Sequence, residues 1–554
     1  MSEQITNLSA IIQEKFGANA TYVEGLYDRF SKNPGSVDES WRSFFSELID
    51  GKSSAVSATN GQTASAAVLK TETAAQATEP KAAPLPELKL SGDVDVKPLT
   101  GISKVIVENM EESLTVPTAT STRRIPVKVL DENRRIINEN LTSHGHGKVS
   151  YTHLIGWAIV KALKAYPQLN FGFGVVDGKP SRLEYENVNL GIAIDIEKKD
   201  GSRNLLVPNI KGCETKNFAE FIDAYNDQVN RARTGKLELS DFKGTSISLT
   251  NPGTLGTVAS TPRLMSGQSA IIATGAIEYP AEFQGMTGAA LSQIGISKII
   301  TISSTYDHRV IQGAESGLFL AKIHEFLTGK HEFYDEIFND LEIKYSPLRW
   351  AEDYNPSLFG GDLVREQIVK QAKVLELINL YRIRGHLLAD IDPLNMTQHQ
   401  AAELDLENFG LTIWDLDREF ITGGLHGKET STLREILWVL RRAYCGKVGI
   451  EYRHIQSSKE KKWLREKIRQ QFVDTEPLSP EIQKALLMKL IEAEQFEQFL
   501  HRKYLGQKRF SLEGTETVIP LLDQLIESAS ERGVEEVYMG MAHRGRLNVL
   551  TNIV

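Results

Sequence analysis

The feature that most constrains this chain is a stretch near the N-terminus, residues 51–98, that contains no aromatic residue. Ala, Ser, Thr, Pro and Glu dominate it. Such a stretch cannot bury enough apolar surface to offset its conformational entropy, so the sequence predicts a flexible linker over 47–98. A linker at this position separates a short N-terminal segment from the rest of the chain. We therefore do not expect the whole chain to fold around one hydrophobic core.

Length and charge narrow the class of protein further. A chain of 554 residues with 41% apolar residues is long enough for three or more packed domains. The net charge of −9, without a long basic cluster, argues against a nucleic-acid partner. No apolar run approaches the ~20 residues that span a bilayer, and the N-terminus lacks a signal-peptide pattern. The two cysteines, Cys213 and Cys445, indicate a reducing compartment, so we expect a cytoplasmic protein without a membrane partner.

Two short motifs carry residues suited to catalysis. The apolar run Ile296 to Ile302 predicts a buried strand, and Ser303-Ser304-Thr305-Tyr306-Asp307-His308-Arg309-Val310-Ile311-Gln312-Gly313 follows it. A histidine at a strand end, ahead of a turn and a helix, can be held rigidly at the edge of a pocket. The second motif, Gly244-Thr245-Ser246-Ile247-Ser248-Leu249-Thr250-Asn251-Pro252-Gly253, is a β-prone run stopped by an Asn-Pro-Gly turn.

Together the motifs resemble the DHR-x-x-DG signature and the hydroxyl-bearing turn of the acyltransferase component of 2-oxoacid dehydrogenase complexes. The resemblance implies that His308 is the general base that activates the thiol of coenzyme A or dihydrolipoamide. It implies that Thr250 donates a hydrogen bond to the tetrahedral oxyanion, and transfer between thiols does need such a base and donor. One position departs from the signature, because Gln312 stands where the family has an aspartate.

The resemblance covers residues 99–333. It implies a mixed α+β domain similar to chloramphenicol acetyltransferase, with the active site between subunits of a trimer and hence a homo-oligomer. The sequence itself predicts helices over Tyr151 to Tyr166 and Phe218 to Val229, and strands over Val188 to Ile194 and Leu205 to Ile210.

The two ends of the chain resemble a different enzyme component. Residues 1–46 predict a small helical unit similar to the N-terminal docking segment of 2-oxoglutarate dehydrogenase. A helical hairpin that packs on its own chain remains the alternative. After a linker over 334–362, residues 363–500 begin with the amphipathic helix Leu363 to Tyr381 and resemble the helical front part of the 2-oxoglutarate decarboxylase component.

Residues 501–554 resemble the start of the thiamine-diphosphate-binding α/β domain of that component. The resemblance rests on Gly506-Gln507-Lys508-Arg509-Phe510-Ser511-Leu512-Glu513-Gly514 and Ala542-His543-Arg544-Gly545-Arg546-Leu547-Asn548. It implies a catalytic role for His543 and a cofactor-binding role for Arg544, as suits a proton shuttle and a guanidinium. The family's Gly-Asp-Gly…Asn segment, which holds magnesium and diphosphate, is expected beyond Val554, so we expect a fragment that does not decarboxylate alone.

The order of these parts defines a multidomain α/β and α+β chain similar to the fused 2-oxoglutarate dehydrogenases of actinobacterial type. The resemblance implies decarboxylation of 2-oxoglutarate and succinyl transfer to coenzyme A. It also implies dihydrolipoamide dehydrogenase and a lipoyl domain on a separate protein as partners. The alternative is that residues 99–333 are a non-catalytic oligomerisation or regulatory core, which Gln312 favours because an amide lacks the aspartate charge.

A pair of histidines offers a weaker signal. His144 and His146 in a Gly-rich stretch supply at most two metal ligands, with no acidic or cysteine partner nearby in the sequence. A connecting loop is the better interpretation, and we predict no metal site there.

Overall fold

The structure of the protein is a computed structural model. It describes residues 113–197, 203–265, 267–353, 363–392, 401–474, 478–541 and 543–554, with scattered positions in 27–46, 107–111 and 394–396. The chain forms two compact units, Met1–Val96 and Lys97–Val554, and each is described by itself. The predicted linker over 47–98 lies outside the described residues.

In the first unit, three aromatic side chains pack together. The ring of Phe45 lies 5.4 Å from the rings of both Tyr27 and Phe30, measured between centroids. Phe30 and Phe45 are buried, and a short 3-10 turn, Pro34–Ser36, lies between them in the sequence. The described positions around these aromatics are helical, as the sequence predicts, and the other residues of 1–46 lie outside the described residues.

The second unit is built on a six-stranded mixed sheet in the order β1-β10-β9-β8-β4-β7. β8 is parallel to both of its neighbours, whereas β1, β10 and β9 pair antiparallel. The strands of this sheet are β1 (Thr118–Pro126), β4 (Leu190–Ile192), β7 (Asn209–Ile210), β8 (Ile247–Thr250), β9 (Ala270–Thr274) and β10 (Ile299–Asp307). Three two-stranded ribbons add β2 (Phe171–Val176) with β3 (Lys179–Glu184), β5 (Ile194–Glu197) with β6 (Arg203–Leu206), and β11 (Glu419–Ile421) with β12 (Thr430–Thr432).

Three predicted strands differ in their limits. The strand expected over Ile296 to Ile302 is β10, which continues to Asp307 because its polar end pairs with β1 on one side and β9 on the other. The strand expected over Val188 to Ile194 divides into β4 and β5. The strand expected over Leu205 to Ile210 divides into β6 and β7, since Pro208 has no N–H to offer a ladder.

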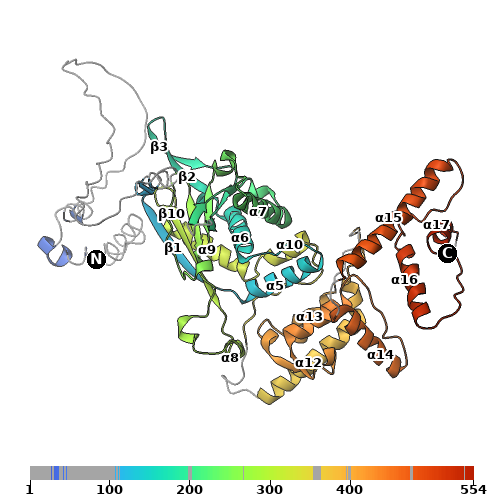
Figure 1. The fold of residues 1–554 in the computed structure, drawn as a ribbon. Coiled ribbons are helices and arrows are strands. Elements are labelled where there is room, and N and C mark those ends of the chain that lie inside the picture. The colour runs from blue at the N-terminus through green and yellow to red at the C-terminus, as the bar shows by residue number, and fades with distance from the viewer. Residues whose placement is uncertain are drawn as a thin grey trace, which may run out of the picture. The chain divides into compact units, whose positions relative to one another are not determined.

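Helices cover the sheet, and Figure 1 shows α6, α7 and α10 gathered on one side of it. The predicted helix from Tyr151 is confirmed as α6 (Tyr151–Ala165), which is apolar on most of its surface and buried between its neighbours. The other helices of this part are α5 (Lys128–Ser143), α7 (Phe218–Arg233), α8 (Gly288–Gln293), α9 (Gly313–Leu327) and α10 (Phe333–Asp340).

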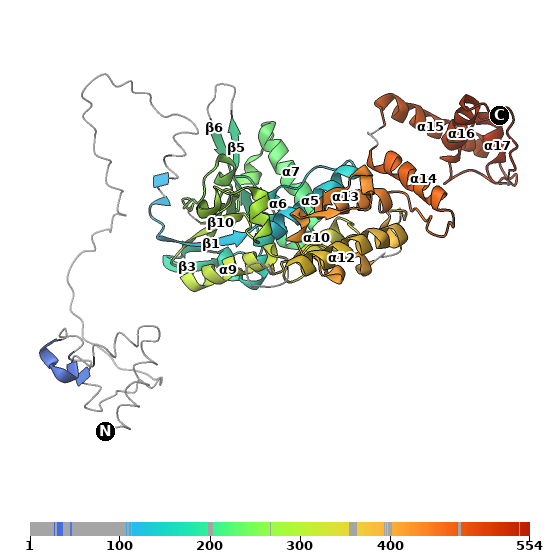
Figure 2. The same ribbon diagram turned by 90° about the horizontal axis from the view of Figure 1, so that it is seen from below.

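The helical region consists of α12 (Leu363–Arg384), α13 (Leu433–Tyr444) and α14 (Ser458–Ile468). It shares one hydrophobic core with the sheet and its helices, running from Ile125 to Val473. α5 and α13 lie side by side in both views (Figure 1, Figure 2). The interval 334–362, predicted as a linker, begins with the packed helix α10, whose Phe333, Tyr334, Ile337 and Phe338 are buried. Periodicity over eight residues was too short a signal to reveal it.

The last part of the chain has a small core of its own, made of Ala493, Leu512, Ile519 and Val549. The helices around it are α15 (Pro480–Lys503), α16 (Val518–Glu531) and α17 (Arg546–Asn552). α15 runs without a break across residue 500, where the sequence placed a domain boundary. No strand occurs within 478–541 or 543–554, so the described residues of this part do not yet display an α/β domain. Among the described helices of the chain, none has the length and apolar character needed to cross a membrane.

Candidate active site

His308 directly follows β10, as the sequence predicts, and its backbone is fixed by both neighbouring segments. Its N–H donates to the carbonyl of Pro117, just before β1, at 3.0 Å. The preceding Asp307 N–H donates to the carbonyl of Ser269, just before β9, at 3.2 Å. The imidazole itself is exposed, with the ring of Tyr306 5.8 Å away. A rigid backbone with a free imidazole suits a base that must meet an incoming thiol.

An ion pair within the turn holds this conformation. The buried carboxylate of Asp307 accepts from Arg309 through its backbone N–H at 3.0 Å, Nε at 2.9 Å and Nη2 at 2.6 Å. The guanidinium of Arg309 also lies over the ring of Phe173 in β2, 3.7 Å from the centroid. Val310 and Ile311 donate their N–H groups to the carbonyl of Asp307. The fork geometry of arginine thus locks the residues on both sides of His308.

Gln312 begins α9 and bonds within its first turn. Its N–H donates to the carboxylate of Glu315 at 2.8 Å, and its carbonyl accepts from Ser316. Arg309, the arginine nearest in the sequence, has its carboxylate partner in Asp307. The arginine nearest to Gln312 in the sequence is therefore not left without a counter-ion. Sequence reasoning overlooked Asp307 as that partner, although an Asp two residues before an Arg in a tight turn is a usable signal.

Thr250 is the last residue of β8, as predicted, and is half-buried. The next residue, Asn251, donates from Nδ2 to the hydroxyl of Thr152 in α6 at 2.9 Å, which anchors the turn to a core helix. Gly253 has no room for a side chain, because a Cβ there would overlap the backbone of Gly275. The Asn-Pro-Gly turn thus fixes the position of Thr250.

The structure does not bring Thr250 and His308 together within one chain. Thr250 pairs with Ala273, and Ala273 pairs with Ser303, so Thr250 lies level with a residue five positions before His308. Five residues correspond to about 17 Å along the strand direction. Across the sheet, β8 and β10 are two strand spacings apart, which is about 10 Å. The two side chains lie toward opposite ends of the sheet. If they serve one reaction, they come from different chains.

A second group of predicted residues lies in the last part of the chain, where the structure joins the two motifs. The N–H of Gly545 donates to the carbonyl of Phe510 at 2.9 Å. Buried Glu497 of α15 accepts from the backbone of Leu512 at 3.0 Å and from Asn548 at 3.2 Å. A buried carboxylate between two motifs is a contact that only tertiary structure reveals, and the sequence analysis missed Glu497.

The side chains of His543 and Arg544 are exposed beside this network, with the ring of Phe510 5.9 Å from that of His543. Within the described residues, no three His, Cys, Asp or Glu side chains gather closely enough to hold a metal ion.

His144 lies outside both groups. Its Nε2 is 3.2 Å from Asp390, which also binds Lys344 at 3.1 Å and Lys447. These hydrogen bonds hold the pKa of Asp390 well below its usual range, although burial acts to raise it. The histidine therefore joins an ion-pair cluster between α5 and the helical region.

Comparison with known families identifies the part of the chain that carries the first group of residues. Residues 91–333 match the family described as 2-oxoacid dehydrogenases acyltransferase (catalytic domain), and residues 15–52 match the 2-oxoglutarate dehydrogenase N-terminus. The sheet, its helices and the His308 turn therefore define an acyltransferase domain of the 2-oxoacid dehydrogenase type.

The whole chain has longer relatives. A protein of Mycolicibacterium vanbaalenii named multifunctional 2-oxoglutarate metabolism enzyme is 47% identical over 97% of this chain and 45% of its own length. The 2-oxoglutarate dehydrogenase E1/E2 component of Corynebacterium glutamicum is 46% identical over the same shares. The chain belongs to the family of these multifunctional enzymes and spans less than half of their length.

Solved structures are more distant. A probable dihydrolipoamide acetyltransferase of Listeria monocytogenes has 25% identity and a TM-score of 0.37, and covers 43% of this chain and 94% of its own. This overall likeness is too low to add to the family match.

Proposed function

We propose that the chain is part of a fused 2-oxoglutarate dehydrogenase, in which residues 99–333 transfer a succinyl group from dihydrolipoamide to coenzyme A. The observation that carries the proposal is the restrained turn at His308. The Asp307–Arg309 pair and the Pro117 carbonyl hold the backbone while the imidazole stays exposed. The family match over residues 91–333 and the names of the relatives supply the reaction class.

The proposed step is a thiol exchange on a thioester. The imidazole of His308 takes the proton of the coenzyme A thiol, and the thiolate sulfur adds to the succinyl carbonyl carbon. The hydroxyl of Thr250 from a neighbouring chain donates to the oxyanion, which is worth about 2.7–4 kcal/mol of barrier for one such donor. The bond to the dihydrolipoamide sulfur then breaks, and the proton returns from His308 to that sulfur. A homo-oligomer is a requirement of this scheme.

His308→Ala tests the scheme in this chain, with free succinyl-dihydrolipoamide and coenzyme A as substrates. We expect turnover to fall by about 10²–10⁴-fold, the usual worth of a general base, while thermal unfolding stays unchanged. His331→Ala is the matched control, because His331 is another exposed histidine of the same part. Its described contacts are with Lys322, Glu325 and the ring of Phe326. Equal turnover in the two variants would remove His308 from the reaction.

A second candidate function is a non-catalytic oligomerisation core, favoured by Gln312 in place of the signature's aspartate. The two candidates differ in the unmodified chain, because a core without chemistry transfers no succinyl group. We expect modest transfer, and we expect Gln312→Asp to leave it nearly unchanged. The cation that an added carboxylate would pair with, Arg309, is already bound by Asp307. A large gain from Gln312→Asp would instead show that the native turn lacks a needed charge.

The decarboxylase part of the proposal concerns His543 and Arg544. We propose that they face thiamine diphosphate and 2-oxoglutarate in the full-length protein, where magnesium is held by residues outside this chain. A separate lipoyl-bearing protein and dihydrolipoamide dehydrogenase would complete the reaction in the cytoplasm. Arg544→Ala in the full-length protein should abolish decarboxylation and spare succinyl transfer. Loss of both activities would contradict two separate centres.

A further inference from the structure

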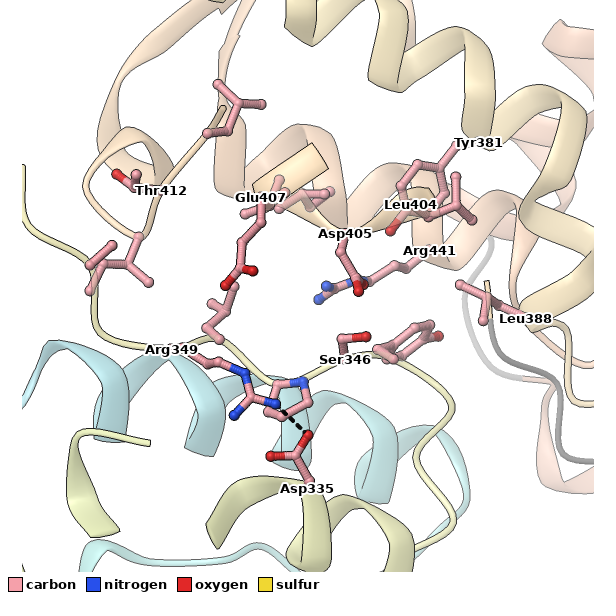
Figure 3. A pocket seen from close by; sticks show the side chains of 18 residues that line it. Asp335, Ser346, Arg349, Tyr381, Leu388, Leu404, Asp405, Glu407, Thr412 and Arg441 are labelled. Carbon is pink, nitrogen blue, oxygen red and sulfur yellow. Dashed lines mark hydrogen bonds and ion pairs between the residues drawn. The ribbon is translucent and has the colours of Figure 1, made fainter. Parts of the chain in front are cut away.

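A cavity lies between the acyltransferase domain and the helical region, and none of the site residues assigned above lines it. Its volume is about 250 Å³, close to that of eight waters. One wall is the segment from Tyr345 to Ala351 that follows α10, and the other comes from α12, α13 and the turns around Asp405. Figure 3 shows Arg441, Asp405 and Glu407 projecting from the helical region toward Ser346 and Arg349 on the opposite wall.

Arg441 supplies positive charge to the cavity. The guanidinium carbon of Arg441 lies over the ring of Tyr345, 4.7 Å from its centroid. The side chain also hydrogen-bonds with the hydroxyl of Tyr381. Among the described residues Arg441 forms no ion pair, although the charge of Glu139 acts on it at longer range. Its Nε is buried without a hydrogen-bond partner there. Arg349, the other arginine of the cavity, is already paired with Asp335 at 2.7 Å. Arg441 is therefore the guanidinium that can accept an anion from outside.

Negative charge faces it from Asp405 and Glu407. Both carboxylates line the cavity, and neither forms an ion pair with another described side chain. Burial and the charge of Glu407 raise the pKa of Asp405, whereas a hydrogen bond with Ser346 and the charges of Arg441 and Arg349 act to lower it. Asp405 is half-buried and Glu407 is exposed. A half-buried carboxylate without an ion pair is costly, so a group that pairs with Asp405 and with Arg441 would be bound with a gain in free energy.

The remaining wall is aliphatic. Leu348 lies on the acyltransferase side, and Leu404, Ile413 and Leu437 lie on the side of the helical region. A ligand that satisfies the charged groups also meets an apolar surface of several side chains. Pockets of this kind orient a ligand through a few polar groups and bind its body by burial.

We propose that this cavity binds a small aliphatic zwitterion, an α-amino acid with a branched apolar side chain. The ligand carboxylate pairs with Arg441, its ammonium group with Asp405 and Glu407, and its side chain packs on the leucines. Because the two walls belong to different parts of the chain, the ligand bridges them and stabilises their joint. The site is independent of the acyl-transfer proposal.

Thermal unfolding and calorimetric titration of this chain with L-leucine test the proposal. Two probes of the same shape lack one charge each: 4-methylpentanoate has no ammonium group and 3-methylbutylamine has no carboxylate. We expect L-leucine to bind and to raise the melting temperature, with each control probe at least tenfold weaker. Probe concentrations up to about 10 mM detect a Kd near 1 mM, which corresponds to about 4 kcal/mol.

Variants assign the binding to the cavity. Arg441→Gln and Asp405→Asn should each weaken L-leucine binding at least tenfold. Arg442→Gln, on the same helix but outside the cavity, should leave it unchanged. Circular dichroism shows whether each variant folds, and Asp405→Asn keeps the proposal testable if Arg441→Gln does not fold. No binding of L-leucine, equal binding of all three probes, or equal binding by wild type and a folded Asp405→Asn variant would overturn the proposal.

Discussion

The charged residues around His308 show how neighbouring residues can compensate for one departure from the acyltransferase signature, Gln312 in place of an aspartate. Gln312 cannot supply negative charge, yet the turn retains an anion because Asp307 is buried and binds Arg309 through three donors. The stacking of Arg309 on Phe173 ties the same turn to β2. The conformation of the turn that carries His308 therefore depends on Asp307 more than on position 312.

His153 is a buried residue whose protonation should be visible in stability. It is 4% exposed on α6, its Nδ1 accepts from the N–H of Ser150 at 2.9 Å, and its ring packs edge-on against Tyr225. Burial lowers the pKa of His153 to about 4, whereas an unfolded histidine titrates near 6.5. The unfolded chain therefore binds more protons between these values, and stability falls as the pH drops through this window.

We predict that wild type loses about 2 kcal/mol more than His153→Gln between about pH 7 and about pH 5, because glutamine does not titrate. Urea unfolding of this part of the chain at the two pH values measures the difference. Tyr225→Phe, which keeps the ring against His153, is the control and should retain the wild-type pH dependence. Parallel curves for wild type and His153→Gln would mean that the histidine is charged in the folded state.

At the scale of elements, helices from the two halves of the second unit meet through an ion-pair network. Arg434 of α13 binds Glu132 of α5 and Asp417 in the turn before β11. Lys128 binds the same two carboxylates, at 3.3 Å to Glu132 and 2.5 Å to Asp417. Although burial acts to raise it, the hydrogen bonds from Arg434 and Lys128 hold the pKa of Asp417 well below its usual range. The carboxylate of Asp417 thus keeps its charge at neutral and mildly acidic pH.

Arg434→Met should destabilise the second unit by about 3 kcal/mol, because it leaves the buried carboxylate of Glu132 with Lys128 as its main cation. Adding Glu132→Gln should restore part of the loss, since the unpaired charge is then gone. Lys373→Met is the control. Its exposed pair with Glu376 is worth about 0–1 kcal/mol. A loss for Arg434→Met no larger than that of the control, measured by urea unfolding, would show that the joint does not depend on this network.

At the scale of the whole molecule, the separation of Thr250 and His308 means that the proposed reaction requires two chains. Transfer activity can therefore be used to test whether the site forms between chains. Two inactive chains, His308→Ala and Thr250→Val, carry complementary defects if the site forms between chains. If the two chains mix at random, about a quarter of the sites then contain both native residues, His308 from one chain and Thr250 from its neighbour. We predict recovery of about that fraction of transfer activity after co-refolding. Separate refolding followed by simple mixing is the control. No recovery in co-refolded oligomers that contain both chains would contradict a shared site.

Much of this architecture follows from local sequence. The helices α6, α7 and α12 have apolar periodicity, and α6 and α7 also begin at capping residues. These local signals decide where a helix forms. The strand, turn and helix around His308, and the turn after Thr250, are set by β-branched runs and Asn-Pro-Gly chemistry for the same reason. The sequence by itself therefore determined which side chains stand at strand ends, and the motifs determined their proposed roles.

Tertiary structure alone decided which distant residues meet. The helix α10 is too short for its period to be visible, and it forms because its aromatic side chains enter a core built by other segments. The pairing of Arg434 with Glu132, 302 residues apart, and the meeting of Arg441 with Asp405 in one cavity depend on how helices pack. Sheet register likewise sets the distance between Thr250 and His308. Periodicity specifies which face of a helix or strand is buried. Only tertiary packing specifies which other element that face packs against.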